Sequence, residues 1–393
     1  MPWREVSKMQ QKQEFVRLAM QEGANRRELC RRFAIHPSTA YKWLARAAAG
    51  QDLAERSRRP HSSPGRSEAA LEEQVLKLRE AYPAWGARKL CKLLEREGIQ
   101  APAVSTVHEI LRRGGCIVPP AGGSPATTRF EAAAPNLLWQ MDFKGWRQLG
   151  DGTRCHPLTV IDDHSRFVPC LQACADQQSR TVQGHLQRTF ERYGLPEAIF
   201  VDNGSPWGGS GGEPGRRQWT AMRVWLLKLG IRTIYSRPYH PQGRGKNERF
   251  HKTMDVEIFD LVRFANLAQL QHRFDRWRDT YNCERPHEGL GLAVPADRYR
   301  VSSRPMPKTL PQPQYDARDI VRRVSSTKAY VSFKGRFWSV PKAFRGEHLA
   351  IRPTNRDGRY GVFFAAHRIA TIDLTKPKSV GHLHEQVSPM SPV

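Results

Sequence analysis

Three acidic residues, Asp142, Asp202 and Glu248, stand in local settings that suit phosphoryl transfer. Asp142 lies in the strand-like run 137–143, Asp202 directly follows the apolar run 198–201, and Glu248 opens an expected helix. Carboxylates from separate elements can converge on Mg²⁺, which prefers oxygen ligands. Two such ions about 3.5–4 Å apart stabilise the attacking and leaving oxygens of an in-line displacement at phosphorus. The three residues are therefore candidate catalytic and metal-binding residues for two Mg²⁺, with Mn²⁺ expected to substitute.

The patterns around the two aspartates predict where they point. Apolar and polar residues alternate in 137–143, so Asp142 should face away from the layer that contains Trp139 and Met141. The run 198–201 is apolar without alternation, as expected for a central strand covered on both faces. Asp202 should then lie at the carboxyl end of the sheet, where α/β folds place their ligands.

Glu248 belongs to an expected helix over about 245–262. One face of this helix is apolar and comprises Phe250, Met254, Ile258 and Leu261. Glu248 should point off that buried face. Three cations on the helix are expected to reach DNA phosphates, with a solvated basic face as the alternative: Lys246, Arg249 and Lys252. His240 and His251 flank the acid and could orient a phosphate or a water, or only pack.

The composition favours a polyanionic partner. The net charge is +25, which favours a polyanion such as DNA. The length of 393 residues is enough for two to four domains, and the hydrophobic content of 39% indicates that linkers join them. An anionic membrane would be the competing partner. The sequence, however, has no apolar run of about 18 residues and no signal-like segment, so we expect a cytoplasmic chain without a membrane partner. Paired carboxylates could also hydrolyse glycosides, but the charge fits DNA better than sugar.

The N-terminal residues 1–50 have helix-turn-helix spacing. Asn25 can cap the second of three short helices, and Pro37 suits the first turn of the third. The third helix would offer four residues to a major groove: Ser38, Thr39, Lys42 and Arg46. The alternative is an ordinary three-helix packing unit. A basic linker, 51–67, follows and presents Arg58 and Arg59 for DNA binding.

Residues 68–117 predict a second helix-turn-helix-like domain. Ser105 is expected to cap its last helix, 106–113, which ends in the candidate DNA contacts Arg112 and Arg113. The small net charge leaves a dimerisation or packing module as the alternative. Residues 118–135, rich in Pro, Gly, Ala and Thr, should form a second linker.

The rest of the chain predicts an α/β domain and a small β domain. Within 136–300, three strands in succession and then alternating helices and strands indicate a mixed five-stranded sheet covered by helices. A Pro-rich linker, 301–318, precedes short strands over 319–376, which suggest a small DNA-binding β-barrel that includes Arg336. The tail 377–393 is expected to be mobile. The chain is thus expected to be multidomain, with all-α units first and a β-barrel last.

Motifs around the acids carry a family resemblance. They are Trp139-Gln140-Met141-Asp142-Phe143, 159–166, 201–207 and 237–251, and 281–291 closes the segment. In this order they resemble the catalytic core of bacterial insertion-sequence transposases of the retroviral-integrase type. The resemblance implies a ribonuclease H-like fold and a DDE triad carried by Asp142, Asp202 and Glu248. It also implies Mg²⁺-dependent hydrolysis that frees a 3′-OH, followed by attack of that 3′-OH on a target strand without a covalent enzyme intermediate.

One departure from the family pattern lies between the second and third acids. Asp202 and Glu248 are separated by 45 residues, a wider spacing than in the family core. The additional residues are assigned to the glycine-rich insertion 207–217, which could be a loop that contacts DNA or a loop without a function. Asp162 and Asp163 are expected to be structural residues of a hairpin turn, with metal binding as the alternative. Trp207 and Trp225 are expected in the core rather than as base-stacking platforms.

Three functional hypotheses follow. The first is a transposase that binds double-stranded DNA at its element ends and at a target, works as a homo-oligomer because two ends are joined in concert, and associates with the bacterial nucleoid. The second is a DNA-binding regulator with an inert α/β domain, which predicts a broken triad. The third is a nuclease that only hydrolyses DNA and makes no joined products.

Overall fold

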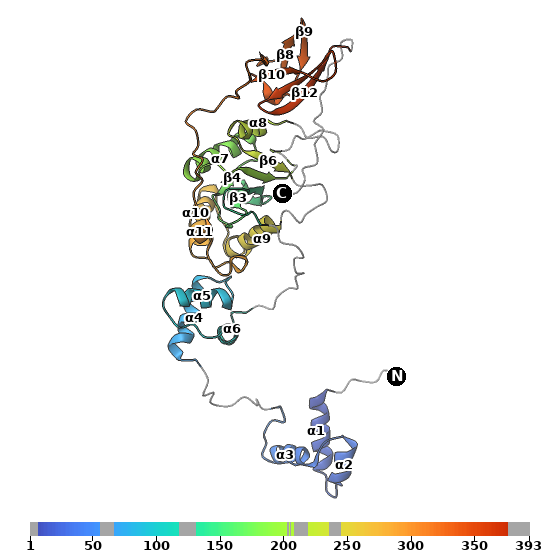
Figure 1. The fold of residues 1–393 in the computed structure, drawn as a ribbon. Helices are drawn as coiled ribbons and strands as arrows, with labels where there is room; N and C mark the ends of the chain where they lie inside the picture. The colour runs from blue at the N-terminus through green and yellow to red at the C-terminus, as the bar shows by residue number, and fades with distance from the viewer. Residues whose placement is uncertain are drawn as a thin grey trace. The chain divides into compact units, whose positions relative to one another are not determined.

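The computed structural model describes residues 7–55, 67–117, 131–202, 204, 206–207, 219–235 and 245–375. The chain forms two compact units, Met1–Glu68 and Ala69–Val393, which are considered one at a time (Figure 1). Several sites expected from the sequence lie outside the described residues: Arg58, Arg59, His240, nearly all of the glycine-rich insertion, and the tail 377–393.

The first unit is a trihelical module with the spacing expected from the sequence. Its helices are α1 (Lys8–Ala19), α2 (Arg26–Arg32) and α3 (Pro37–Ala48). The Asn25 side chain caps α2, and Pro37 occupies the first turn of α3, as predicted. Phe15 is fully buried at the centre of the module. Its ring meets Phe33 edge-on at 5.5 Å and Trp43 at 5.9 Å, so one aromatic side chain joins all three helices.

The second unit begins with another three helices: α4 (Ala69–Ala81), α5 (Ala87–Arg96) and α6 (Val104–Arg113). Their core contains the buried residues Leu90, Leu94 and Ile110. The predicted cap at Ser105 is wrong. Helix α6 starts at Val104 after Ala103, and no side chain caps it, so Ser105 lies inside the first turn. Helix α6 packs into the module through the buried side chains of Val107, Ile110 and Leu111, without a polar cap.

The central sheet is mixed, as predicted. Its strands are β1 (Trp139–Phe143), β2 (Arg147–Gln148), β3 (Arg154–Asp162), β4 (Cys170–Cys174), β5 (Ala198–Val201) and β6 (Arg232–Tyr235). Strand β3 pairs antiparallel with β4 and β1, whereas β1, β5 and β6 are parallel neighbours. The predicted count of five strands is one too low, because the two-residue strand β2 also pairs with β3.

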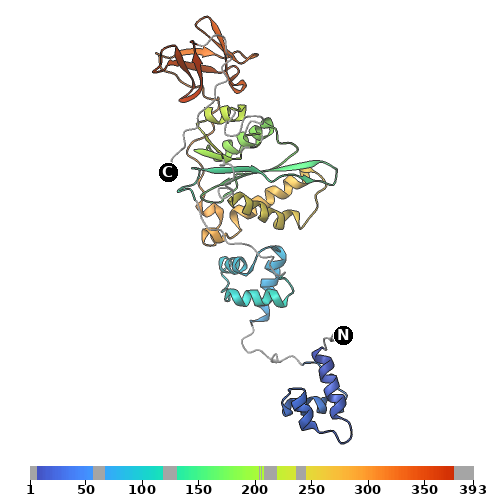
Figure 2. The ribbon, with the colours of Figure 1, turned by 90° about the vertical axis from the view of Figure 1, so that its right-hand side faces the viewer.

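Helices cover both faces of this sheet, as Figure 2 shows in an edge-on view. One face packs against α7 (Ser179–Tyr193) and α8 (Ala221–Lys228) in a cluster that includes Trp139 and Met141. The other face packs against α9 (Gly245–Met254) and α10 (Leu267–Cys283). The apolar layer of β1 thus faces α7 and α8, as its alternation predicted.

A π-helical turn, η2 (Asp255–Phe259), continues α9 and ends the helix. Phe250, Met254 and Ile258 are buried together, as predicted. Leu261 was expected on the same face but is 45% exposed. The helix ends at Phe259 with Asp260 as its C-cap, so Leu261 lies in the turn that follows and not on a continued helical face. The short helices η3 (Glu288–Leu290) and α11 (Pro295–Arg298) complete this domain.

The last domain is a sheet structure but not the predicted barrel. One sheet has the order β12 (His367–Asp373), β11 (Arg359–Phe364), β10 (His348–Pro353) and β7 (Ile320–Arg323). A separate hairpin pairs β8 (Tyr330–Phe333) with β9 (Arg336–Ser339), followed by the short helix η4 (Lys342–Phe344). The sheet does not close, because in the described residues its outer strands β12 and β7 are not paired with each other.

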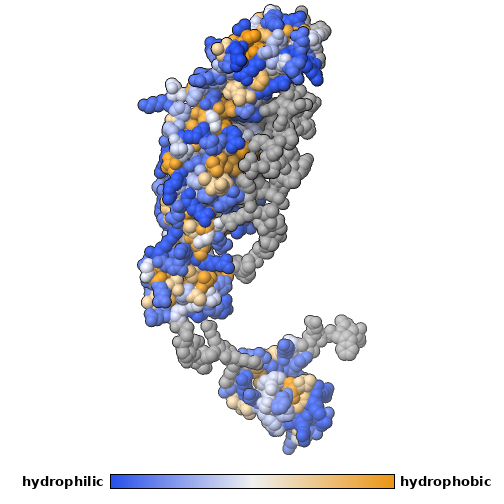
Figure 3. Space-filling view, viewed as in Figure 1, coloured by the Kyte–Doolittle hydropathy of each residue, from blue (hydrophilic) through white to orange (hydrophobic). Residues whose placement is uncertain are grey.

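The surface agrees with the strongly charged composition. Hydrophilic residues predominate on the visible face of the first unit and of the last domain, with apolar residues scattered among them (Figure 3). In the described part of the chain, we find no helix with the length and apolar character needed to cross a bilayer.

Candidate active site

Two of the three acids come from adjacent strand ends. Strands β1 and β5 are parallel, with Trp139 opposite Ile199 and Gln140 opposite Phe200. Continued by two residues, this register aligns Asp142 with Asp202. Neighbouring strands lie about 4.8 Å apart, and matched residues of parallel strands point to the same face. The sheet therefore brings the two carboxylates to one edge, the carboxyl end of its parallel half.

Backbone and side-chain donors orient each aspartate. The amide of Phe143 donates to Oδ1 of Asp142 at 2.9 Å. Oδ1 of Asp202 accepts two hydrogen bonds, from the amide of Gly204 at 2.9 Å and from Nε1 of Trp207 at 2.6 Å. Both aspartates are half-buried. The bond from Trp207 could not be found from the sequence, because the residue follows a turn whose path no local pattern sets.

The helix that carries Glu248 is anchored beside Asp142. Nε2 of His251 lies 2.9 Å from Oγ1 of Thr159, and this hydroxyl donates to the backbone carbonyl of Asp142 at 3.0 Å. Thr159 is also the cross-strand partner of Asp142. Because the threonine proton is already donated, Nε2–H of His251 is the donor to Oγ1. Glu248 itself is exposed one turn earlier on the same helix.

Burial and the neighbouring Lys144 ammonium lower the pKa of His251 to about 4. The imidazole is therefore neutral at pH 7. It anchors α9 through Thr159, which favours the packing role over contact with a phosphate or a water.

A second link joins the same two elements. Asp255, in the π turn after α9, pairs with Lys144 at 2.6 Å and with Arg147 at 2.7 Å. Burial by itself would raise the pKa of Asp255, but the hydrogen bonds from Lys144 and Arg147 outweigh it and lower the pKa. The carboxylate is ionised at pH 7 and ties the end of β1 to the end of α9.

Lys246 was expected to reach phosphates but is engaged inside the protein. Its ammonium lies 2.5 Å from Oδ1 of Asp163 and donates to the Asp163 carbonyl at 3.1 Å. Asp163 is fully buried and also accepts from Gln140 at 2.7 Å. Asp162, likewise buried, accepts from the amide and hydroxyl of Ser165. Asp162 therefore bonds within its own turn, whereas Asp163 joins that turn to β1 and α9. Arg249 and Lys252 remain exposed beside Glu248.

The donor chemistry of the three acids fits Mg²⁺, which takes carboxylate oxygens and keeps water or phosphate as further ligands. Within the part of the chain that the structure describes, no three His, Cys, Asp or Glu side chains converge closely enough to hold a metal ion. The structure thus brings Asp142 and Asp202 together by strand register and does not gather Glu248 into the same cluster.

The first helical unit presents the predicted recognition helix to solvent. Ser38 and Lys42 are exposed on α3, and Thr39 and Arg46 are half-buried. Arg46 also donates to the carbonyl of Ala54 at 3.3 Å. Tyr41, 58% exposed on the same helix, is a further candidate contact that the spacing argument missed.

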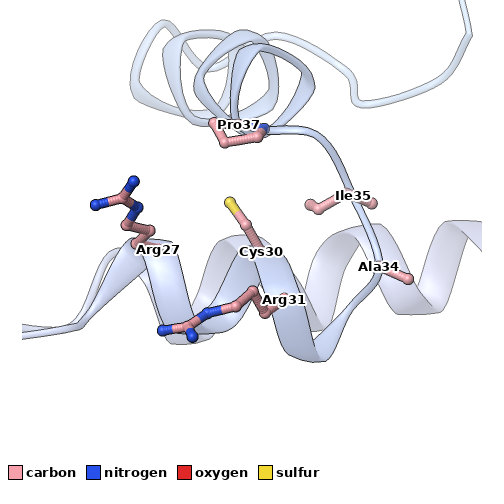
Figure 4. A pocket seen from close by; sticks show the side chains of 6 residues that line it. All are labelled: Arg27, Cys30, Arg31, Ala34, Ile35 and Pro37. Carbon is pink, nitrogen blue, oxygen red and sulfur yellow. The ribbon is translucent and has the colours of Figure 1, made fainter.

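A pocket of about 570 Å³ lies beside this helix. Cys30 points into it from α2, and Pro37 borders it at the start of α3, as Figure 4 shows. Two cations on α2, Arg27 and Arg31, also line it. They add positive charge next to the residues that the sequence assigned to DNA.

The other predicted DNA contacts differ in their surroundings. Arg112 and Arg113 lie in ion pairs with Glu109 and Glu72. The helices of this second module also contact the central domain, because Tyr82 donates to the Glu284 side chain at 2.9 Å and Arg96 to its carbonyl at 3.2 Å. These contacts favour a packing role for the module. Arg336 is exposed on β9.

Trp207 and Trp225 belong to the buried core cluster against α7 and α8, as predicted. Trp207 is nevertheless both a core residue and a direct partner of Asp202.

Known protein families match all the modules. Residues 132–241 and 229–295 match integrase core domains, and residues 319–379 match the C-terminal domain of IS481 family transposases. Residues 11–61 match a helix-turn-helix domain, and residues 39–111 a homeodomain-like domain. The chain belongs to the insertion-sequence transposases with an integrase core. Helix-turn-helix domains thus precede a ribonuclease H-like core with a mixed sheet in this transposase.

Relatives of the transposase come from bacterial mobile elements. An uncharacterized 31.7 kDa protein of insertion element IS407 from Burkholderia multivorans is 24% identical over 241 residues, 60% of this chain and 83% of that protein. An uncharacterized 39.2 kDa protein of IS476 from Xanthomonas euvesicatoria is 25% identical over 277 residues, 69% and 75% of the two chains.

Among solved structures, the transposase resembles a chain of the simian T-cell lymphotropic virus intasome in complex with the PP2A regulatory subunit B56 gamma. The match has 16% identity and a TM-score of 0.36 over 75% of this chain and 99% of that one. A likeness at this level supports no conclusion about function.

Proposed function

We propose that this transposase binds the ends of its insertion sequence, hydrolyses a phosphodiester to free a 3′-OH, and transfers that 3′-OH to a target DNA strand. The observation that carries the proposal is the parallel pairing of β1 with β5, whose register aligns Asp142 with Asp202. The anchoring of α9 to the partner strand of Asp142 supports a role for Glu248 beside them.

The proposed chemistry consists of two displacements at phosphorus. In the first, a water oxygen attacks a phosphodiester at the element end, and the bond to the 3′ oxygen breaks. In the second, the freed 3′-OH attacks a phosphodiester of the target, and the target's own 3′ oxygen leaves. Each step forms one P–O bond and breaks one, so neither needs a covalent enzyme intermediate.

The carboxylates of Asp142, Asp202 and Glu248 would hold two Mg²⁺ or Mn²⁺. When bound, these ions favour deprotonation of the attacking oxygen and stabilise charge on the attacking and leaving oxygens. The protein's own contribution is orientation: the Phe143 amide fixes Asp142, and Trp207 and Gly204 fix Asp202. Exposed Arg249 and Lys252 would bind phosphates next to the scissile bond.

DNA is the proposed partner throughout. The exposed face of α3 would read the element ends in a major groove, with Ser38, Thr39, Lys42 and Arg46 as contacts. The last domain would bind DNA through backbone phosphates, with Arg336 among its contacts. Because two ends are joined in concert, the active form is a homo-oligomer assembled on DNA. We place it in the bacterial cytoplasm on the nucleoid.

The test is a joining reaction with a pre-cleaved element end, a supercoiled plasmid and Mg²⁺. Wild-type protein should give joined products. The variants Asp142→Asn, Asp202→Asn and Glu248→Gln should bind the end and fail to join it. Asp260→Asn, an exposed acid after the π turn, is the matched control and should join normally.

Each contrary outcome has a distinct meaning. Nicked plasmid without joined product would identify a nuclease. End binding by wild-type protein with neither cutting nor joining would identify an inert regulator. Joining by any of the three triad variants would remove that residue from the catalytic set.

A further inference from the structure

Trp207 has an unusual combination of partners for a core tryptophan. It is 3% exposed and belongs to the cluster against α7 and α8. Its Nε1–H is directed at a carboxylate, donating to Oδ1 of Asp202 at 2.6 Å. Hydrogen bonds to an ionised acceptor are shorter and stronger than neutral ones. Packing alone would not require the indole N–H to be directed at this acid.

The backbone of Trp207 is fixed from two further elements. Its carbonyl accepts from the Tyr235 hydroxyl of β6 at 3.2 Å and from the Thr220 hydroxyl at 3.4 Å. Thr220 is the N-cap of α8, where its side chain also accepts from the Arg223 amide. The indole is therefore held in place independently of its bond to Asp202.

The indole also touches the neighbour of the other aspartate. It stacks on Phe143, with ring centroids 5.4 Å apart and an angle of 21° between the rings. Phe143 donates its amide to Asp142. One side chain thus binds Asp202 and packs against the residue that orients Asp142.

Gly204, two residues after Asp202, contacts the same carboxylate. The Gly204 amide donates to the oxygen that Trp207 also binds. A Cβ at position 204 would lie 3.1 Å from Oδ1 and 3.2 Å from Oδ2 of Asp202, which is tighter than ordinary contact. Glycine is the residue that lets this backbone approach the acid closely.

We propose that Trp207 is a positioning residue for the reaction: its indole N–H sets the orientation of the Asp202 carboxylate, and its stack on Phe143 couples that orientation to Asp142. This inference rests on the proposed function. Asp202 lies just beyond the last residue of β5, so the strand ladder does not restrain its side chain. The indole N–H contributes that restraint together with the Gly204 amide. Partners that orient metal-binding residues typically change metal affinity or activity by about 10–100-fold when removed.

The first experiment replaces Trp207 with Phe, which keeps an aromatic ring in the core and removes the N–H donor together with part of the indole ring. Joining should fall about 10–100-fold, and the Mg²⁺ concentration for half-maximal joining should rise. The matched control is Trp225→Phe, because Trp225 lies in the same core cluster and stacks on Phe190. It should lower thermal stability comparably without changing the Mg²⁺ dependence.

A second measurement does not depend on activity. In protein labelled with ¹⁵N-tryptophan, the indole resonance missing from Trp207→Phe identifies Trp207. That resonance should shift in Asp202→Asn, because the acceptor loses its charge, and should stay in place in Asp260→Asn. Should Trp207→Phe fail to fold, Trp225→Phe identifies and excludes the other core indole. One remaining indole resonance should then shift in Asp202→Asn and stay in place in Asp260→Asn.

The outcomes separate the two proposals. If Asp202→Asn joins DNA normally, the proposed catalytic role of Asp202 is wrong. If Asp202→Asn is inactive while Trp207→Phe matches Trp225→Phe in rate and Mg²⁺ dependence, the positioning role alone is wrong. An unchanged chemical shift of the Trp207 indole in Asp202→Asn would also overturn the positioning role.

Discussion

Nε2 of His251 lies 2.9 Å from Oγ1 of Thr159, the residue that pairs with Asp142 across the antiparallel strands. This contact fixes the helix of the third acid against the strand pair of the first. The two elements are distant in sequence, so this contact and the Asp255 ion pairs together give α9 a defined position along β1.

Thr159→Val should weaken both the fold and the reaction. Valine keeps the volume but leaves the buried His251 N–H and the Asp142 carbonyl without the hydroxyl. An unsatisfied buried polar group costs about 1–3 kcal/mol, so the free energy of unfolding in urea should fall by that amount. Joining should fall as α9 loosens. Thr253→Val, which removes an exposed hydroxyl bond on the same helix, is the control. Equal effects of the two variants would argue against the anchor.

Acidification should destabilise the protein through His251. Its pKa is about 4 in the folded chain, below the unfolded value of about 6.5. The unfolded state therefore binds the proton first as pH falls. The stabilisation is fully present above pH 6.5 and is lost progressively toward pH 4, by at most about 3 kcal/mol. Urea unfolding between pH 7.5 and 4.5 should show a flatter profile for His251→Gln than for wild type. Parallel profiles would show that another group controls this range.

The Lys144–Asp255 pair should show coupling in a double-mutant cycle. Asp255→Asn leaves Lys144, whose side chain is 8% exposed, without its carboxylate. Breaking a buried pair costs about 3–5 kcal/mol, and the partial exposure of Asp255 should reduce this value. Lys144→Met with Asp255→Asn should be more stable than Asp255→Asn alone. Additive free energies of unfolding in the cycle would mean that the pair makes no net contribution.

Lys246 and Lys252 should behave differently although both are cations on α9. Lys246→Ala leaves the buried Asp163 unpaired and should lower thermal stability sharply. Lys252→Ala removes an exposed charge and should leave stability unchanged. If Lys252 binds a phosphate, its loss reduces the slope of log affinity against log salt by about one. A normal melting temperature for Lys246→Ala would contradict the structural role of its ion pair.

Much of the local structure was predictable because its signals are local. The Asn25 cap of α2 and the first-turn position of Pro37 in α3 were both predicted, since each signal acts within one turn of its helix. The errors concern helix ends and the pairing of distant strands. Helix α6 starts at Val104, before the expected cap Ser105, the helix that carries Glu248 ends before Leu261, and the last domain is an open sheet.

The sequence by itself determined the order of the modules, because periodicity, caps and turn residues act within a few positions of each other, and it singled out the three acids as candidates. The tertiary structure decided which strands are neighbours, and hence that Asp142 aligns with Asp202. It also decided that Trp207 binds Asp202 and that His251 anchors to Thr159. These relationships depend on strand order and side-chain packing across long chain separations, which no local pattern specifies.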